Sequence, residues 1–363
     1  MNGKVLIIAE DAKSLILTRK ELIEAIIRRG CQCDVLVPQD KYCSILEDMG
    51  CSIVDISFER RSINPIGELK LIRKYIKHLS KNKYDFVITY SIKPNIYGGL
   101  ACCLSKTPYY INITGMGSAL NGKGVVKHIV KALYRLVAPR ANGVFFENEG
   151  NKDAFIRWKL SKESNSHVFH GAGINLSAFE YSPADSDNET VTFLYVGRLM
   201  EEKGVVELCN AAKKIGEKYP NTIFEFAGDF EDTFEKTFND EYKGIKNIKY
   251  LGYRDDIKEC IRRCDCVVLP SYHEGMANAL LEGGAIGRPL LASNIYGCRE
   301  AIVEGKNGFV FEPHDENSLY EAIEKFLKFS STEREMFGKE SRKHIEEYFD
   351  RQKIVEEIIK IVF

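Results

Sequence analysis

The chain has 363 residues, enough for two domains, and its hydrophobic content of 44% and charged content of 28% are ordinary for a globular protein. The net charge of −1 hides an asymmetry, because residues 1–170 contain 26 Lys and Arg against 16 Asp and Glu, whereas the remainder contains 25 against 36. A basic half suits phosphates or an anionic membrane surface, although scattered lysines on a solvated face are the commoner cause of such a count.

The N-terminus and the cysteines narrow the class of protein further. The apolar run at 5–9 is too short for a signal peptide or a membrane-spanning helix, so we expect a first strand there. The eleven cysteines show neither two CxxC pairs nor the downstream His spacing of a zinc site. We therefore expect reduced, mostly buried thiols in a cytosolic protein, and no metal.

The first half of the chain predicts alternating strands and helices. A strand at 5–9, a helix at 14–29 that Gly30 stops, and a strand at 33–38 form a βαβ opening. The loop after the first strand reads AEDAKS and lacks a GxGxxG pattern, which argues against a dinucleotide-dependent oxidoreductase. We expect a Rossmann-like first domain with further strands at 52–56, 86–89, 109–113, 143–147 and 166–169.

Polar residues follow two of these strands. Lys93 and Asn95, in YSIKPNIYG, come after the strand at 86–89, and Thr114 comes after the strand at 109–113. Because the carboxyl ends of parallel strands meet at one edge of a sheet, we expect these three side chains to point into a ligand-binding cleft. The alternative is that Lys93, Pro94 and Asn95 occur here only because Pro and Asn favour turns.

Residues 122–138 predict a basic amphipathic helix. Lys127, Lys131 and Arg135 recur at a spacing of four. The apolar residues gather on another side, and they are Val126, Ile129, Val130, Leu133, Leu136 and Val137. Such a helix can lie on a membrane and pair its cations with anionic lipid, or it can pack on a core with a wet face. We expect core packing with some membrane contact.

A domain boundary is expected at 179–189, which combines Ser and Pro with four acidic residues, the composition of a linker. The second domain then opens with a strand at 192–196, followed by GRLMEEKGV. Arg198 and Lys203 flank this turn into a helix, so two cations and a helix N-terminus converge, as a diphosphate requires.

The stretch 265–300 organises the second domain. An apolar strand at 267–269 stops at Pro270, and a helix is expected from near Met276 to Ala285. This arrangement is a strand, a loop and a helix, the unit from which open α/β sheets build ligand sites at their carboxyl edge.

The loop of this unit would bring Glu274 and Gly275 to the edge of the sheet, and the helix start would offer free N–H groups to an anion. Glu282 lies eight residues after Glu274, about 80° away on a continuous helix, so the two carboxylates do not stack. The alternative interpretation is a solvated helix carboxylate and a loop carboxylate on an ordinary α/β unit.

The Glu-x7-Glu spacing, with its flanking Pro-Ser, Glu-Gly, Leu-Leu-Glu and Gly-Arg-Pro, resembles the signature of retaining nucleotide-sugar glycosyltransferases of family four. The resemblance implies the α/β GT-B fold, in which two Rossmann-like domains face a central cleft. The sequence GR-x4-KG resembles that family's diphosphate clamp, which implies this role for Arg198 and Lys203. By the same resemblance Glu282 binds the ribose hydroxyls of the donor and Glu274 lies beside the transferred sugar.

YSIKPNIYG and NITGMGS resemble the subgroup that builds capsule, O-antigen and other lipid-linked glycans. The resemblance implies a polyprenyl-diphosphate-linked glycan as the acceptor, with Lys93, Asn95, Thr114 and Gly115 as acceptor-side candidates. Thr114 stands where many members carry a His that contacts the donor sugar, so the contribution of that His is not carried over to this chain.

The domains implied are an acceptor-binding domain, 1–178 plus a C-terminal helix of about 350–363, and a nucleotide-sugar-binding domain, 190–349. The expected reaction is retaining transfer of a hexose or N-acetylhexosamine from a nucleotide sugar, most simply a UDP-sugar, at the inner face of the cell membrane. We expect a cytoplasmic, peripheral protein that needs no cofactor or metal besides the donor and binds no nucleic acid.

The residues that the resemblance assigns fall into two sets. The catalytic candidates are Arg198, Lys203 and Glu274. The donor-binding candidates are Gly197, Arg198, Lys203, Glu274, Gly275, Met276, Ala277, Asn278 and Glu282.

Three other functions compete with this hypothesis. A retaining glycoside hydrolase could use Glu274 and Glu282, but its carboxyl groups must lie about 5 Å apart, and the cations at Arg198 and Lys203 would have no purpose. A nucleotide-sugar epimerase of the same fold would turn over its donor without an acceptor. A non-catalytic nucleotide-sugar-binding protein would bind the donor without consuming it.

Overall fold

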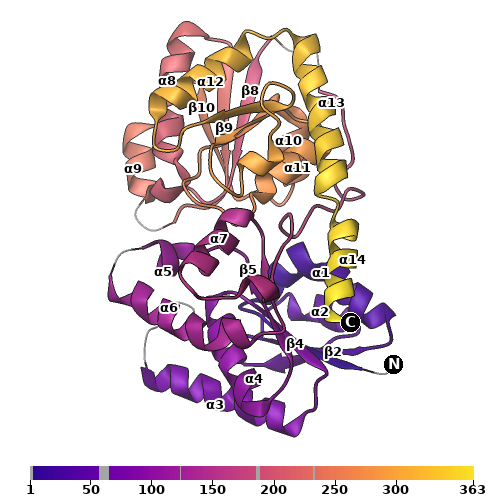
Figure 1. Ribbon diagram of the computed structural model, residues 1–363. Helices are drawn as coiled ribbons and strands as arrows, with labels where there is room; N and C mark the ends of the chain where they lie inside the picture. Colours follow the sequence, from indigo (N-terminus) through magenta and orange to yellow (C-terminus); the bar gives the residue numbers. More distant parts are fainter. Residues whose placement is uncertain (1–2, 57–64, 123, 185–188, 232–233) are drawn as a thin grey trace. The chain divides into compact units, whose positions relative to one another are not determined.

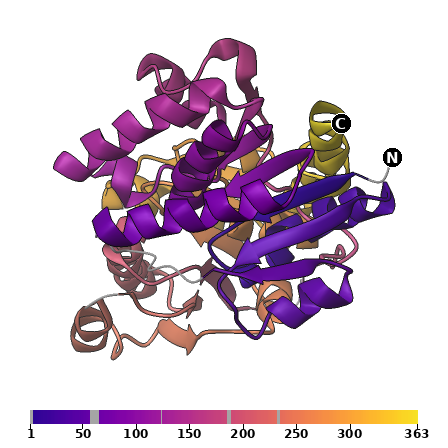
Figure 2. The ribbon, with the colours of Figure 1, turned by 90° about the horizontal axis from the view of Figure 1, so that it is seen from below.

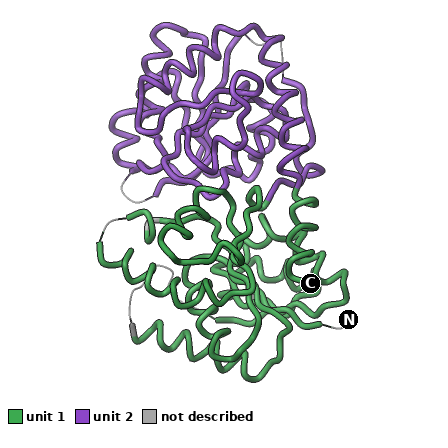
Figure 3. The backbone as a smooth tube through the Cα atoms, viewed as in Figure 1, with its two compact units in different colours: residues 1–172, 351–363 green, residues 173–350 purple. Residues whose placement is uncertain are grey.

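The computed structural model describes residues 3–56, 65–122, 124–184, 189–231 and 234–363. The chain forms two compact units, Met1–Ala172 with Arg351–Phe363, and Gly173–Asp350 (Figures 1 and 3). Each unit alternates strands and helices around its own parallel sheet, which confirms the prediction of two Rossmann-like α/β domains. The stretch 179–189 begins inside the second unit, where Ser182 N–H donates to Ile286 O at 3.0 Å.

The first unit contains seven parallel strands in the order β3-β2-β1-β4-β5-β6-β7. Their sequences, such as KVLII in β1, are continuous apolar runs because helices cover both faces of the sheet. The strands are β1 (Lys4–Ile8), β2 (Gln32–Val37), β3 (Ser52–Asp55), β4 (Phe86–Tyr90), β5 (Tyr109–Ile113), β6 (Gly143–Phe146) and β7 (Ser166–Val168).

Two layers of helices cover this sheet, one on each side (Figure 2). The layer that packs on Val5 and Ile7 consists of α1 (Ala12–Arg28), α2 (Cys43–Asp48) and α14 (Arg351–Val362). The layer that packs on Leu6 and Ile8 consists of α3 (Pro65–Lys81), α4 (Gly99–Ser105), α6 (Val125–Val137) and α7 (Glu149–Arg157). Neighbouring strand residues enter different layers because side chains of a strand alternate between its faces.

Local signals explain where α1 begins and ends. The Asp11 side chain accepts a hydrogen bond from Ser14 N–H at 2.7 Å, which caps the helix. Gly30 has a φ of 80° and donates to Ile27 O at 2.8 Å, so the chain leaves the helix through the left-handed region that favours glycine.

The basic helix packs on the core along only part of its apolar side. α6 begins at Val125, later than expected, because Gly124 has a φ of 108° that a helix does not accommodate. The predicted core packing is confirmed by its buried residues, Val130, Tyr134 and Val137. Other residues that the sequence assigns to the apolar side are exposed, namely Val126, Ile129 and Leu136.

The C-terminal helix α14 belongs to the first unit, although the chain has passed through the whole second unit before reaching it. Arg351 Nη1 lies 3.0 Å from Glu21 Oε2 of α1, and Tyr110 of β5 donates to Ile361 O at 3.2 Å. Ile354 and Ile358 are buried in the same core, so both polar and apolar contacts hold the helix there.

The second unit contains six parallel strands in the order β10-β9-β8-β11-β12-β13. The strands are β8 (Val191–Val196), β9 (Thr222–Ala227), β10 (Ile248–Gly252), β11 (Cys266–Leu269), β12 (Leu290–Ser293) and β13 (Gly308–Phe311). Its helices are α8 (Val205–Lys218), α9 (Phe234–Glu241), α10 (Ile257–Arg263), α11 (Asn278–Ile286), α12 (Glu316–Leu327) and α13 (Ser331–Tyr348).

The chain also contains short helical elements. They are α5 (Gly117–Asn121), a π-helical turn η1 (Pro94–Gly98), and the 3₁₀ turns η2 (Ala138–Arg140), η3 (Glu163–Asn165), η4 (Glu201–Lys203) and η5 (Arg299–Ala301).

Arg288, the arginine of the Gly-Arg-Pro motif, is fully buried and structural. Its guanidinium donates to Ile261 O at 3.0 Å and to Arg262 O at 2.5 Å, two carbonyls at the end of α10. Ile261 O also accepts from Cys264 N–H at 3.3 Å. The guanidinium also donates to Ser182 O at 2.7 Å. Burial lowers the pKa of Arg288. This side chain therefore fastens the start of the second unit to the end of α10.

All eleven cysteines are free thiols, ten of them buried and Cys103 half-buried, as the sequence predicts. None of the described helices has the length and apolar character needed to span a bilayer.

Candidate active site

The loops that carry the main site candidates leave two adjacent strands of the second unit. The chain runs from β8 outward to β9 and β10, and then returns to the other side of β8 as β11. Such a reversal creates a switch point, where the loops at the carboxyl ends separate and a ligand can bind. The loop at 197–204 follows β8, and the loop at 270–277 follows β11.

Lys203 and Glu274 meet at this switch point. Lys203 Nζ lies 2.6 Å from Glu274 Oε1, and the two side chains are only 18% and 16% exposed. Gly204 explains the close approach of the loops, because a Cβ on this residue would lie 2.1 Å from Pro270 O. Its φ of 68° is also in the left-handed region that glycine accepts, so both space and conformation require glycine after the lysine.

Arg198 lies on the same loop and pairs with Glu231, a residue that follows β9. The backbone register creates this pair, since Leu199 N–H donates to Asp229 O at 2.8 Å and Glu231 N–H donates to Leu199 O at 3.1 Å. The β8–β9 pairing thus continues beyond the sheet and sets Glu231 beside Arg198. Glu231 could not be predicted from the sequence, because no local signal links residues so far apart in the chain.

A buried tyrosine, Tyr195, fixes the backbone at Arg198 by a hydrogen bond. Tyr195 is fully buried and donates to Arg198 O at 2.7 Å, and burial raises the pKa of this phenol. The neighbouring Gly228 approaches so closely that a Cβ would lie 1.9 Å from Gly197 O. The Arg198 guanidinium itself is more than half exposed, so a fixed backbone presents a cation that solvent can reach.

The helix after the β11 loop begins later than the sequence predicts. α11 starts at Asn278, not near Met276, because Ala277 N–H donates to Gly297 O at 2.8 Å instead of joining the helix. Met276 and Ala277 are buried, and their side chains belong to the hydrophobic core of the second unit. The helix start from which the sequence predicts free N–H groups is therefore at Asn278, whose side chain is exposed.

The two glutamates of the motif lie on different elements, as predicted. Glu274 is in the loop, Glu282 is half-buried within α11, and Gly275 is buried between them in the chain. Gly297 packs against this loop with a φ of 89°, and a Cβ there would lie 2.5 Å from Gly275 O. The loop after β12 thus fixes the backbone next to Glu274.

A second polar cluster at this edge was also missed from the sequence. Tyr272, two residues before Glu274, donates a hydrogen bond to Glu207 of α8. Its ring lies against that of His314, with the centroids 3.5 Å apart and the ring planes tilted by 31°. Burial and the Glu207 bond both raise the pKa of Tyr272. Burial lowers the pKa of the adjacent His273, so the neutral imidazole is favoured.

The acceptor-side candidates lie in the first unit, at the carboxyl ends of β4 and β5. They differ in exposure and in the contacts of their side chains. Lys93 Nζ lies 2.7 Å from Glu68 Oε1 of α3. Thr114 is exposed directly after β5, and Gly115 has a φ of 144°, a conformation open to glycine.

Asn95 does not point into an open cleft, contrary to the expectation from the sequence. It is 1% exposed, accepts from Thr89 Oγ1 at 2.7 Å and donates to Asn112 O at 2.8 Å. These bonds join the loop after β4 to β5. Asn95 therefore holds the loop that carries Lys93.

The arrangement in the second unit suits a diphosphate. Two cations, Arg198 and Lys203, and the start of α11 lie at one edge of the sheet, and fixed positive charge of this kind stabilises a phosphate leaving group. Within the described ranges, no group of three or more His, Cys, Asp and Glu side chains could hold a metal ion.

Family models match both units of the chain. Residues 4–148 match the model described as glycosyl transferase 4-like, and residues 180–344 match the model described as glycosyl transferases group 1.

Several known proteins resemble most of the chain. The N,N'-diacetylbacillosaminyl-diphospho-undecaprenol alpha-1,3-N-acetylgalactosaminyltransferase of Campylobacter jejuni is 30% identical over 326 residues, which cover 85% of each chain. The capsular polysaccharide biosynthesis glycosyltransferase CapM of Staphylococcus aureus is 26% identical over 98% of this chain and 96% of its own. The UDP-Gal:alpha-D-GlcNAc-diphosphoundecaprenol alpha-1,3-galactosyltransferase of Escherichia coli is 29% identical over 72% and 71%.

Solved structures share the fold at lower identity. HepE from Anabaena, in complex with UDP and glucose, superposes with a TM-score of 0.81 at 19% identity and covers 99% of both chains. A glycosyltransferase from Rickettsia africae gives a TM-score of 0.81 at 16% identity, over 99% of this chain and 98% of its own. With a relative at 30% identity over 85% of its length and GT-B neighbours for its whole fold, the chain belongs to the family-four glycosyltransferases.

Proposed function

We propose that this glycosyltransferase moves a hexose or N-acetylhexosamine from a UDP-sugar to a polyprenyl-diphosphate-linked glycan, in the synthesis of a surface polysaccharide. The observation that carries the proposal is the cluster of Arg198, Lys203 and Glu274 at the switch point of the second unit. The substrate classes are supported by relatives whose names specify UDP-galactose and undecaprenyl-diphosphate-linked sugars.

The donor would bind with its diphosphate at Arg198, Lys203 and the start of α11. A nucleoside diphosphate leaving group gathers negative charge as the glycosidic bond breaks, and fixed cations in a partly dry site stabilise that charge. Because Lys203 and the helix start are held by the backbone of two packed loops, little reorganisation is needed when the charge develops. We propose that these groups are sufficient and that transfer requires no divalent cation.

Glu274 would change partners when the donor binds. Its carboxylate pairs with Lys203, and a diphosphate that engages the lysine would leave the carboxylate able to accept hydrogen bonds from hydroxyls of the transferred sugar. Glu282, on α11, would accept from the ribose hydroxyls. We propose retention of the anomeric configuration, which is supported by the Glu-x7-Glu pattern that the chain shares with retaining enzymes.

The first unit would bind the acceptor through the loops after β4 and β5. Lys93, Thr114 and Gly115 are the candidates there, and Asn95 would act as a positioning residue that holds the first of these loops. A polyprenyl-linked acceptor resides in a membrane, so we propose that the enzyme is cytoplasmic and works peripherally at the inner membrane face.

Mass spectrometry of product formation tests this function. The chain is incubated in EDTA with a panel of nucleotide sugars, with and without a polyprenyl-diphosphate-sugar acceptor. An acceptor-dependent disaccharide from one donor is the expected result, and proton NMR of its anomeric coupling tests retention. Isomerised donor without acceptor would instead identify an epimerase, and donor binding without any turnover would identify a binding protein.

A matched pair of variants tests the placement of the donor site. Glu282→Ala is expected to weaken UDP binding by about tenfold or more, because hydrogen bonds to a charged group contribute about 1.5–3 kcal/mol. Glu340→Ala, at an exposed position of α13, supplies a control carboxylate deletion outside the proposed donor contacts. Equal UDP affinity of the Glu282→Ala variant and the unmodified chain would contradict the ribose assignment.

A further inference from the structure

The positive charge of the first unit is concentrated on one of its two helical layers. α3, α4 and α6 together carry eight Lys and Arg and one acidic residue, Glu68. On the opposite side of the sheet, α1, α2 and α14 carry seven Lys and Arg and six Asp and Glu. α7 packs on the same side as α3 but carries two charges of each sign. The excess of positive charge therefore belongs to the surface formed by α3, α4 and α6, here called the α3–α4–α6 face.

The single acidic residue does little to offset these cations. Glu68 Oε1 lies 2.7 Å from Lys93 Nζ, which belongs to a loop outside the three helices, and both side chains are largely covered. The cations of α3 are exposed, and they are Lys70, Arg73, Lys74, Lys77 and Lys81. The face therefore presents a field of one sign to its surroundings.

Large apolar side chains are exposed on the same face. In the described part of the first unit, seven of the ten exposed large hydrophobic residues belong to these three helices. They are 40% to 73% exposed, and they are Ile66, Leu69, Leu104, Val125, Val126, Ile129 and Leu136. Aliphatic side chains interspersed with lysines are typical of surfaces that enter the boundary between lipid headgroups and acyl chains.

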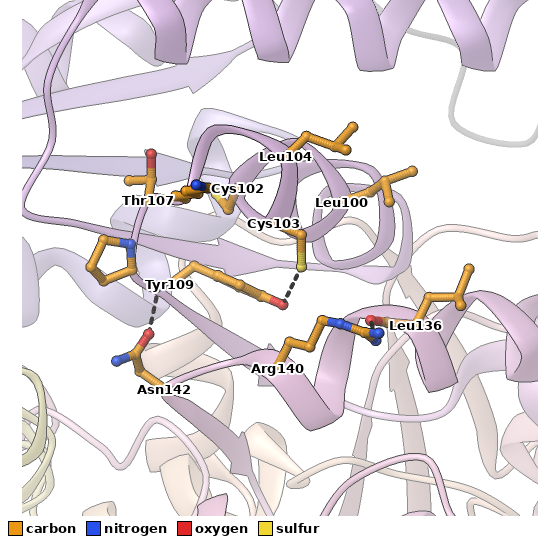
Figure 4. Close-up of a pocket in the computed structure, with 11 residues that line it drawn as sticks. Leu100, Cys102, Cys103, Leu104, Thr107, Tyr109, Leu136, Arg140 and Asn142 are labelled. Carbon is orange, nitrogen blue, oxygen red and sulfur yellow. Dashed lines mark hydrogen bonds between the residues drawn. The ribbon is translucent and has the colours of Figure 1, made fainter.

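A hollow of about 620 Å³ lies at the amino end of β5, between α4 and α6 (Figure 4). Leu100 and Leu104 of α4 and Leu136 of α6 line it, with Arg140 beside Leu136. The hydroxyl of Tyr109, which also lines the hollow, already has partners within the protein. It donates to Val137 O at 2.6 Å and lies 3.0 Å from Cys103 Sγ. The hollow therefore offers mainly hydrocarbon to a ligand, and Lys106 and Arg140 are the cationic residues among its lining.

We infer that the α3–α4–α6 face docks on an anionic lipid bilayer. Its lysines and arginines meet headgroup phosphates, its aliphatic side chains enter the headgroup boundary, and the hollow beside Leu104 takes an acyl chain. Single-stranded nucleic acids favour aromatic stacking platforms, which the exposed aliphatic residues do not provide. The inference deepens the proposed function, because it names the surface that brings the enzyme to a lipid-linked acceptor.

Vesicle flotation of the full chain, without donor or acceptor, tests this inference separately from catalysis. We expect binding to phosphatidylcholine vesicles that contain phosphatidylglycerol, weakening with salt, and little binding to phosphatidylcholine alone. The double variant Lys74→Glu with Lys77→Glu is expected to lower the partition coefficient at least about 30-fold, since each surface cation contributes about 1 kcal/mol.

A double variant of the opposite layer is the matched control. Lys20→Glu with Arg28→Glu on α1 makes the same change in net charge, and it is expected to retain most of the binding. For the apolar contribution, Ile129→Ser is expected to weaken binding about tenfold, and Leu17→Ser, an exposed leucine on α1, is expected to leave it unchanged. The thermal midpoint of each variant verifies that it folds.

Three results would overturn the inference: no binding to phosphatidylglycerol vesicles, equal losses from the α3 and α1 double variants, or binding to a homopolymeric RNA in preference to vesicles at the same salt concentration. A failure of the proposed function has a different signature, because then the unmodified chain would transfer no sugar from any donor while still floating with anionic vesicles.

Discussion

Lys203 and Glu274 approach to 2.6 Å across two loops that the chain separates by a strand, a helix and two further βα units. The cation that we expect to hold the donor diphosphate is thus held by the carboxylate that we expect beside the transferred sugar. A donor must share or displace this carboxylate, so the two residues are coupled before any chemistry takes place.

Neutralising Glu274 should separate donor binding from catalysis. In Glu274→Gln the lysine loses its internal anion, so we expect UDP to bind several-fold more tightly, while the transfer rate falls about 100-fold. Isothermal titration with UDP and initial-rate kinetics measure the two effects. Lys203→Gln is the complementary variant and should weaken UDP binding about tenfold or more; weaker UDP binding by Glu274→Gln would contradict the competition between carboxylate and diphosphate.

Glu231 should act on the donor only through Arg198. The guanidinium is more than half exposed, and its pairing with Glu231 restricts the orientation of its fork. We expect Glu231→Gln to lower kcat/KM for the donor about three- to tenfold, and to have no effect when Arg198 is already replaced by Ala.

The neighbouring exposed Glu235 supplies the control for this cycle, because Glu235→Gln changes the same charge at the start of α9 and should leave kcat/KM unchanged. A full effect of Glu231→Gln in the Arg198→Ala background would show that the carboxylate acts elsewhere.

Replacement of Asn95 by Ala should affect mainly the stability of the first unit, whereas replacement of Thr114 by Ala should affect mainly the binding of the acceptor. Asn95→Ala removes bonds to Thr89 and to the Asn112 carbonyl in a buried site, so we expect a loss of stability of about 1–3 kcal/mol. Thr114→Ala, at an exposed position, should leave the unfolding midpoint within about 0.5 kcal/mol of the original but raise KM for the acceptor. Denaturant unfolding and acceptor-dependent kinetics distinguish these effects.

Arg288→Met should destabilise the second unit strongly. The change leaves the carbonyls of Ser182, Ile261 and Arg262 without their buried donor, and we expect a loss of about 3 kcal/mol or more. Arg263→Met, at an exposed side chain on α10, is the control and should cost less than about 0.5 kcal/mol. Differential scanning calorimetry follows the transition; similar midpoints for both variants would refute the structural role.

His78 should make the first unit less stable in mild acid. Burial lowers its pKa, against the pull of Asp34, and its ring bonds to Tyr84 at 2.7 Å. The folded state therefore binds the proton less readily than the unfolded state, whose pKa is about 6.5. This contribution is complete above the unfolded pKa and is lost as pH falls toward the lowered folded pKa. The unfolding midpoint should drop less between pH 7.5 and 5.5 in His78→Gln than in the original chain.

Part of the site could be predicted because its signals are local. The apolar runs, the GR-x4-KG turn and the Glu-x7-Glu spacing lie within short windows, and they locate Arg198, Lys203 and Glu274 at the carboxyl ends of strands that the structure contains. The start of α11 was misplaced at Met276, because the bond from Ala277 to the Gly297 carbonyl belongs to a distant loop.

The sequence by itself determined the alternation of strands and helices, since burial on both faces of a parallel sheet demands continuous apolar runs, and glycines end helices such as α1 and α11. It also determined the excess of positive charge in the first half. Only the tertiary structure decided that Glu231 meets Arg198, that Asn95 turns inward, and that the cations collect on one layer of the first unit. These outcomes depend on strand register and on which face of the sheet each helix covers, and both are long-range relationships that no local pattern encodes.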